Sequence, residues 1–316
     1  MSSPTTHVRV GIPLRGNGEM RSNRTILRAA AFAALGVVAA GCGGSDGPNG
    51  APALKNTIVF VSNRSGVDEL YAMNSDGSGA RKIPTLDGPK SYPAVSPNGL
   101  EIAFTLGDLQ TAGTSSIYVA ALDGTAPLRL TTEQGVDYMA SWSPDGSRIA
   151  FVSTRDDNSE IYVMSADGSS QANLTNNPAN DARPSWSPSQ NTILFQSDRM
   201  GETDIYTMTS TGTSVTPVIT GSDPHWSPSG SRFLYKQSGQ IWVYNVSDTP
   251  TTTQITTQAG FYFTPGWSLD ESRITYANTI NNHEEIWAVS SADGSAPTQL
   301  TPDDQGDSYY PSWTRH

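Results

Sequence analysis

Short apolar runs alternate with turn residues along most of the chain. The middle of the sequence shows the pattern best, in the consecutive segments Trp142–Ser153, Glu160–Met164 and Leu174-Thr175. Runs of this length, rich in β-branched and aromatic residues and bounded by Gly, Pro, Asp and Ser, are typical of β-strands. The pattern therefore predicts units of four short strands joined by tight turns.

This unit occurs six times, and three markers recur in constant order. The first is an aromatic or apolar residue before a Ser-Pro-like turn: Val95, Trp142, Trp186, Trp226, Trp267 and Trp313. The second is a three-residue β-rich run, at residues 58–60, 102–104, 149–151, 193–195, 233–235 and 274–276. The third is an apolar–aromatic pair, at residues 70–71, 117–118, 161–162, 205–206, 241–242 and 286–287. Repeats of about 40 to 47 residues with four strands each predict an all-β fold, a β-propeller of six blades.

Two kinds of turn punctuate each unit. Ser143–Gly146 and the related segments Ser96–Gly99 and Ser227–Gly230 predict tight hairpins, because Pro fixes φ and Gly supplies a positive φ. Asp-Gly pairs recur one hairpin later, at residues 76–77, 123–124, 167–168 and 293–294. Their aspartates could be metal ligands or turn residues, and recurrence at turn positions favours the turn.

The repeat unit resembles the WD-like propeller repeat of the TolB family, and the likeness covers nearly everything from residue 55 to the end. The resemblance implies six blades of four antiparallel strands, with the Trp-Ser-Pro run as the innermost strand. The chain would then begin with a second strand at Ile58 and end with a first strand at Tyr310–Thr314. We therefore expect one blade to join three N-terminal strands to one C-terminal strand, which removes free sheet edges.

Residues 1–42 have the features of an export signal. A basic region with Arg21, Arg24 and Arg28 precedes twelve apolar or small residues at 29–40, whereas a membrane-spanning helix needs about 20. The segment ending at Cys42 resembles the lipobox of bacterial lipoproteins, which implies that this sole cysteine is acylated; ordinary signal cleavage is the alternative. We expect residues 43–54 to be a flexible tether and residues 55–316 to be the propeller, with Met20 as an alternative start.

The expected location and the net charge limit the kinds of partner that the protein can bind. The lipid anchor places the protein on a cell-envelope membrane, and Gly43 after the cysteine favours the outer membrane, on its periplasmic or surface face. The formal net charge of −11 repels phosphate backbones, which argues against nucleic acid as a partner. We expect a monomer without a cofactor and without disulfide or thiol chemistry.

Candidate binding residues lie just before each predicted innermost strand. Propellers commonly bind at the mouth of the central channel, on loops that a rigid ring holds in place. The candidates there are Tyr92, Asp137, Tyr138, Asp181, Arg183, Asp223, His225, Tyr262 and Tyr309. Tyrosines with fixed polar groups suit an envelope protein or peptide segment, or a glycan. The resemblance to TolB implies an extended peptide segment, and the alternative is that these are ordinary turn residues.

His225 stands where the other repeats have a small residue. It could line the channel and bind a metal or an anion, or it could fill the space left by Gly266 on the next blade. We favour packing, because a single histidine rarely makes a metal site.

The sequence favours a scaffold over an enzyme. Its one Gly-x-Ser-x-Gly match, at residues 43–47, falls in the expected tether, and the segment that begins at His283 lacks the second histidine of a zinc-protease helix. A carbohydrate-active lyase or hydrolase is the alternative, with Asp137 and Asp181 as acid and base. We predict a non-catalytic binding module without a metal.

Overall fold

The computed structural model describes residues 56–110, 115–132, 134–189, 191–258, 260, 262–302 and 306–314. The predicted signal, the tether and lipidation at Cys42 lie outside the described residues. The regular elements of the described part are 24 β-strands. This part of the chain contains no helix of the length and hydropathy needed to cross a membrane.

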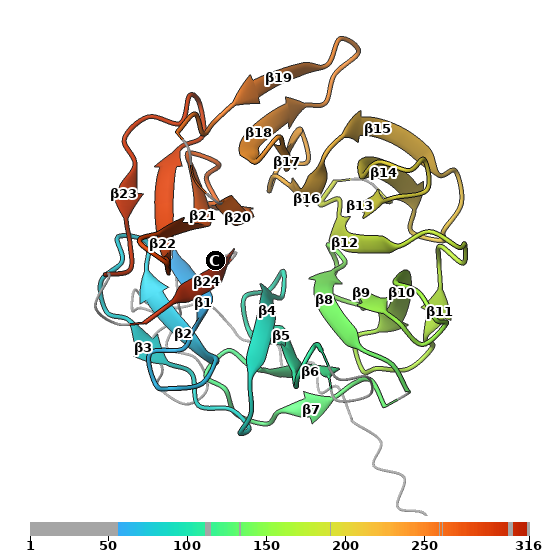
Figure 1. Cartoon of the computed structure of the whole chain (residues 1–316). Coiled ribbons are helices and arrows are strands. Elements are labelled where there is room, and N and C mark those ends of the chain that lie inside the picture. Colours follow the sequence, from blue (N-terminus) through green and yellow to red (C-terminus); the bar gives the residue numbers. More distant parts are fainter. Residues whose placement is uncertain are drawn as a thin grey trace, which may run out of the picture. The chain divides into compact units, whose positions relative to one another are not determined.

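Six four-stranded sheets are arranged as blades around a common axis, and each presents one strand to the centre (Figure 1). The innermost strands are β4 (Lys90–Val95), β8 (Asp137–Trp142), β12 (Asp181–Trp186), β16 (Ser222–Trp226), β20 (Tyr262–Trp267) and β24 (Ser308–Trp313). The second strands are β1 (Thr57–Ser62), β5 (Glu101–Leu106), β9 (Arg148–Ser153), β13 (Thr192–Ser197), β17 (Arg232–Gln237) and β21 (Arg273–Ile280).

The outer half of each blade follows the same order. The third strands are β2 (Glu69–Asn74), β6 (Ser116–Ala121), β10 (Glu160–Ser165), β14 (Asp204–Thr209), β18 (Gln240–Asn245) and β22 (His283–Ser290). The outermost strands are β3 (Arg81–Lys82), β7 (Leu128–Arg129), β11 (Ala172–Asn173), β15 (Thr216–Thr220), β19 (Thr251–Gln254) and β23 (Thr298–Gln299). We number the blades in chain order, so that blade 1 contains β1 and blade 6 contains β20. The predicted all-β propeller of six blades is confirmed.

Blade 1 contains strands from both ends of the described chain. Its sheet has the order β24-β1-β2-β3, with Ile58 opposite Trp313. The N–H of Thr314 donates to the carbonyl oxygen of Thr57 over 2.9 Å, and the Thr57 N–H donates to Thr314 Oγ1 over 3.1 Å. These bonds satisfy the backbone groups where the first and last strands meet.

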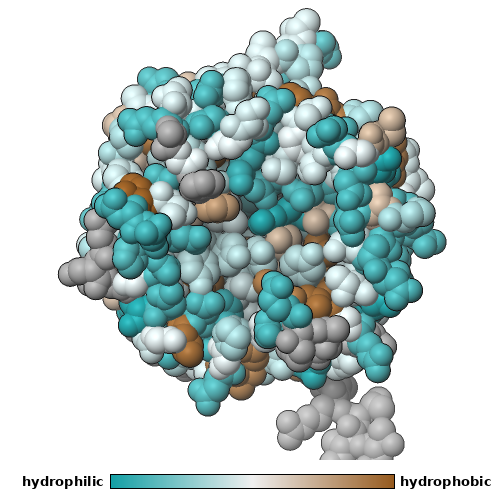
Figure 2. All heavy atoms as spheres, in the orientation of Figure 1, coloured by the Kyte–Doolittle hydropathy of each residue, from teal (hydrophilic) through white to brown (hydrophobic). Residues whose placement is uncertain are grey.

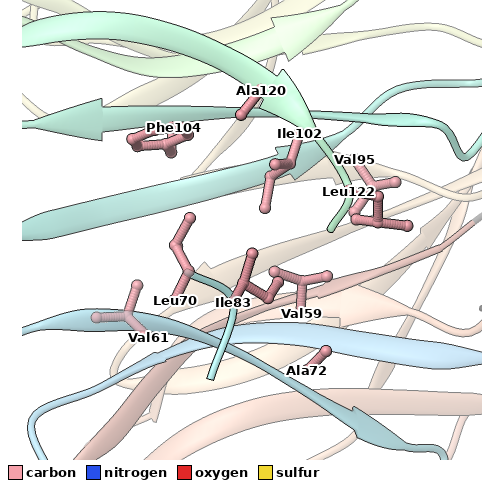
Figure 3. Close-up of a cluster of buried hydrophobic side chains, with 10 residues drawn as sticks. All are labelled: Val59, Val61, Leu70, Ala72, Ile83, Val95, Ile102, Phe104, Ala120 and Leu122. Carbon is pink, nitrogen blue, oxygen red and sulfur yellow. The ribbon is translucent and has the colours of Figure 1, made fainter. Parts of the chain in front are cut away.

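The hydrophobic core is divided among the interfaces between neighbouring blades. Figure 3 shows the cluster between blades 1 and 2, where Val59 and Leu70 from one sheet face Ile102 and Phe104 from the next. Comparable clusters fill the other interfaces. Each fully buried Ile or Phe contributes roughly 1.5–3 kcal/mol through removal from water, so the ring is held by side chains between blades as well as by the sheets. The face in Figure 2 is mostly hydrophilic, with scattered apolar residues.

The Asp-Gly turns bring neighbouring blades into close contact. Gly124 has a φ of +87°, and a Cβ atom there would lie 2.0 Å from the carbonyl oxygen of Pro84, so only glycine fits. Asp123 Oδ1 accepts hydrogen bonds from the Thr125 N–H over 2.9 Å and from its hydroxyl over 2.6 Å. The equivalent aspartates make the same bond to the residue two positions on: Asp76, Asp167 and Asp293. Their predicted turn role is confirmed.

Candidate functional site

Every innermost strand contains a β-bulge at the same place. The pairing of β4, β8, β12, β16, β20 and β24 with the second strand shifts register at this point. One residue in each bulge has a φ between +46° and +57°: Tyr92, Met139, Arg183, Asp223, Thr264 and Tyr310. Proline follows five of these residues and alanine follows Met139. Proline has no N–H to leave unpaired in the bulge, so the sequence accommodates the break in the ladder.

The six bulge residues converge on the axis of the ring. All six line one cavity of about 190 Å³, whose wall is completed by the prolines and tryptophans that follow them on the same strands. A bulge re-aims side chains, and here it turns one side chain per blade toward the centre. The cavity is thus built from six separate strands of a rigid ring.

One part of the cavity wall is charged. The Arg183 Nε lies 2.7 Å from Asp223 Oδ1, and Lys236 Nζ lies 3.3 Å from Asp223 Oδ2. The Asp223 side chain is only 10% exposed, and among the described residues that line the cavity it is the single carboxylate. Charge-assisted bonds of this kind fix the position of the side chains that make them.

The opposite part of the wall is aromatic. The rings of Tyr92 and Tyr310 lie 4.2 Å apart between centroids, and the Arg183 guanidinium lies 5.4 Å from the Tyr92 ring centroid. Burial, together with the neighbouring Tyr92 ring, raises the pKa of Tyr310, so its hydroxyl remains a neutral hydrogen-bonding group. Arg183 therefore links the aromatic and the charged parts of the wall.

His225 lies on the cavity wall and is exposed to it. Its Nδ1 is 3.2 Å from the carbonyl oxygen of Trp226. The atoms nearest to a Cβ built on Gly266 belong to Pro311, Thr275 and Trp313, not to His225. The favoured expectation that His225 fills the space beside Gly266 is therefore wrong; the side chain faces the axis instead.

Asp137 and Asp181 lie inside their blades rather than on the cavity wall. Each is the first residue of an innermost strand and is buried, at 1% and 0% exposure. Asp137 pairs with Arg155 over 3.2 Å, and Asp181 pairs with Arg199 over 3.0 Å. Both arginines also stack on rings of their own blade: Phe151 and Tyr162 in blade 3, Phe195 and Tyr206 in blade 4. The two carboxylates are thus held by structural ion pairs.

Three of the candidate tyrosines also point away from the cavity. The Tyr138 hydroxyl lies 3.3 Å from Ser159 Oγ, and the buried Tyr262 donates to the carbonyl oxygen of Gln258 over 3.1 Å. The Tyr309 hydroxyl donates to Asp68. Of the nine channel-mouth candidates, the structure brings four together around the cavity: Tyr92, Arg183, Asp223 and His225.

Sequence reasoning missed three members of the ring, Met139, Thr264 and Tyr310. A usable signal was present, because every ring residue lies three positions before the aromatic or apolar marker that ends its innermost strand. That signal requires knowing that this position is bulged. A regular strand would alternate its side chains differently and would assign other residues to the axis.

A second hollow lies at the other ends of the innermost strands. It is acidic, and its lining includes Asp68, Asp108, Glu284 and Asp307 together with Tyr310, which also lines the axial cavity. Burial and the nearby Asp307 and Asp68 carboxylates raise the pKa of Glu284. Within the described part of the chain, no three His, Cys, Asp or Glu side chains are placed to hold a metal ion.

These features define a six-bladed β-propeller with a small axial cavity, walled by one bulge residue from each blade. A family model for the TolB beta propeller domain (PD40) matches residues 83–170 and 140–316. The chain belongs to this TolB beta-propeller family.

Solved structures with the same fold include two TolB proteins. The TolB of Acinetobacter baumannii matches with a TM-score of 0.72 and 22% identity over 82% of this chain, which spans 66% of that protein. A putative TolB from Agrobacterium tumefaciens matches with a TM-score of 0.61 and 19% identity, over 81% of this chain and 97% of that one. Hydrazine synthase of Kuenenia stuttgartiensis matches with a TM-score of 0.67 and 13% identity, over 82% of this chain and 47% of that one. At these identities the likeness concerns the fold. A comparison with curated proteins gives no significant match.

Proposed function

We propose that this chain is an exported, lipid-anchored propeller that binds an extended segment of a cell-envelope protein in its axial cavity. The observation that supports this function is the ring of six bulge residues around a cavity of about 190 Å³. Six blades fix these side chains in advance, so little conformational entropy is lost when a ligand contacts them. Such a site suits binding without catalysis.

The chemistry of the wall supports a peptide as the ligand. The Tyr92 and Tyr310 rings offer apolar area for a side chain, and Arg183 and His225 offer polar groups on the other part of the wall. An extended peptide carries both apolar side chains and regularly spaced polar backbone groups. We assign no acid–base role to Asp137 and Asp181, since each carboxylate is buried and paired with an arginine.

Anchoring at Cys42 would supply the cellular context. In this proposal residues 1–42 direct export, the acylated Cys42 holds the protein on an envelope membrane, and residues 43–54 form the tether. The test is fractionation of cells that express the wild type or Cys42→Ser, with metabolic labelling by a fatty acid. We expect label and membrane association for the wild type only. Membrane association of unlabelled wild type would reject the anchor.

Capture of partners from an envelope extract tests the binding site. Met139→Trp places a larger side chain in the cavity at a position that already has a positive φ. Met200→Ala, a change at a side chain that is 77% exposed on a loop, is the matched control. We expect proteins captured by the wild type and the control to be lost with Met139→Trp, provided that the three proteins unfold at similar temperatures. Equal capture by all three would reject the axial cavity as the binding site.

A further inference from the structure

Two cationic side chains and one carboxylate meet at the charged part of the cavity wall: Arg183 and Asp223 line the cavity, and Lys236 on β17 contacts Asp223 from behind this lining. Arg183 and Lys236 both contact the single carboxylate of Asp223. The two cationic side chains remain 25% and 18% exposed. One positive charge is therefore left over at this wall, in a chain whose formal net charge is −11. A local excess of this kind in a low-dielectric hollow attracts an anion.

One buried donor beside this wall has no acceptor among the described residues. Trp226 is only 6% exposed and lines the cavity, yet none of the described residues accepts a hydrogen bond from its Nε1. The equivalent nitrogen of Trp142 donates to the carbonyl oxygen of Ala94 over 3.0 Å, and that of Trp267 donates to the carbonyl oxygen of His225 over 3.2 Å. A buried donor without an acceptor is costly. Because its counterparts donate to the neighbouring blade, this N–H belongs to an interface between blades rather than to the ligand contacts.

We propose that this wall recognises an acidic side chain, an aspartate or glutamate of the bound segment. The inference rests on the proposed function and adds the class of segment. Arg183 holds Asp223 through its Nε, so its terminal amino groups can donate to a second carboxylate, and Lys236 shares the charge. The neighbouring Tyr92 and Tyr310 rings then receive the residue next to the acidic one. A basic segment would meet the Arg183 guanidinium and is disfavoured by like-charge repulsion.

The test begins with a random heptapeptide library selected on the wild type and counter-selected on Met139→Trp. The strongest peptide is synthesised with its acidic residue intact and changed to the amide. We expect selected peptides to be enriched in aspartate and glutamate, and the amide to bind about tenfold more weakly at low salt. Lys236→Gln should weaken the acidic peptide severalfold, and Asp223→Asn should strengthen it.

The control is Lys82→Gln, which removes the same charge from the outermost strand of blade 1, where the lysine is 45% exposed. It should leave affinity within about twofold, because the charge lies on an exposed outer strand. Peptides that need the open cavity but carry no acidic residue would overturn the acidic specificity and leave the binding function standing. If no peptide distinguishes the wild type from Met139→Trp, the proposed function falls as well.

Discussion

Blades 4 and 5 each contribute an aspartate near the start of the innermost strand, but the two carboxylates have opposite surroundings. Asp181 is the first residue of β12, is fully buried and accepts two hydrogen bonds from Arg199, at 3.0 and 3.1 Å. Asp223 lies in the bulge of β16, lines the axial cavity and pairs with Arg183 of the neighbouring blade. One aspartate secures its own sheet, and the other belongs to a surface that a ligand can reach.

A shift of two strand positions separates these two environments. Counted back from the marker tryptophan, Asp181 is five positions away and Asp223 is three. In the bulged strand the third position faces the axis, whereas the fifth faces the interior of the blade. The position relative to the bulge, rather than the residue type, thus decides whether an aspartate is structural or accessible.

The largest expected effect is the loss of stability in Asp181→Ala. The Asp181 carboxylate is fully buried, and its removal also removes the hydrogen bonds that it accepts from Arg199, so we expect a cost of about 2–3 kcal/mol. Asp223→Ala should cost no more than about 1 kcal/mol, because the Asp223 carboxylate is itself partly exposed and its loss removes ion pairs at the surface of the cavity. Urea unfolding monitored by tryptophan fluorescence measures both. Equal losses for the two variants would contradict the assignment of Asp181 to the interior.

A double-mutant cycle sharpens the same contrast. Asp181→Asn combined with Arg199→Met should show a coupling energy of about 1–3 kcal/mol, since the two residues form one buried network. The matching cycle of Asp223→Asn with Lys236→Met should give less than about 1 kcal/mol, because its contact is longer and partly exposed. A larger coupling in blade 5 than in blade 4 would reverse the comparison.

Most of the fold could be predicted from the sequence. The markers at Trp142, Trp186 and Trp226 recur because each blade packs an aromatic side chain in the same place, between its own sheet and a neighbouring one. The turn residues also predicted where the strands end, since a position such as Gly124 has no room for a side chain. The turn residues and the sixfold repeat predict the same structure, and this agreement allows the fold to be predicted from the sequence.

The site was only half predictable, because it depends on contacts between distant residues. The residues near Asp181 in the sequence do not indicate its partner. Arg199, 18 residues later, lies over the Phe195 ring and donates to the Asp181 carboxylate. The bulge that turns Met139 and Thr264 to the axis has no strong residue signature, as both carry side chains rarely found at positive φ. The candidates were taken from the segments just before each predicted innermost strand, and five of the nine do not line the cavity.

A smaller effect is expected at His225, the irregular residue of blade 5. The serine in this place accepts a hydrogen bond from a backbone N–H of the next blade: Ser185 Oγ from Trp226 over 3.0 Å, and Ser141 Oγ from Trp186 over 3.1 Å. His225→Ser should place a hydroxyl where it can accept from the Trp267 N–H, and should raise the free energy of unfolding by about 0.5–1.5 kcal/mol. Chemical denaturation measures the gain, with Ser185→Ala as the opposite control. A loss of stability in His225→Ser would show that the histidine supports the ring.

The smallest effect concerns an aspartate that is neither buried nor on the axis. Hydrogen bonds from the Ser143 hydroxyl, the Ser147 hydroxyl and the Ser147 N–H lower the pKa of Asp145 to about 2. Because the folded-state pKa lies below the unfolded value of about 3.9, the charged form stabilises the fold above pH 4, and this contribution is lost as the pH falls toward 2. The side chain is exposed, so the contribution is below about 1 kcal/mol.

Asp145→Asn isolates this charge, because the protein already has an asparagine in the same turn of blade 2. Asn98 Oδ1 accepts from the Ser96 hydroxyl over 2.7 Å and from the Leu100 N–H over 3.0 Å, so the amide keeps the turn. Asp145→Asn should therefore be slightly less stable than the wild type at pH 6 and equal to it near pH 2, as measured by urea unfolding at both values. A difference that persists at low pH would mean that the amide distorts the turn, and one that grows at low pH would contradict the lowered pKa. At neutral pH the loss of stability in Asp145→Asn should be several times smaller than the loss in Asp181→Ala.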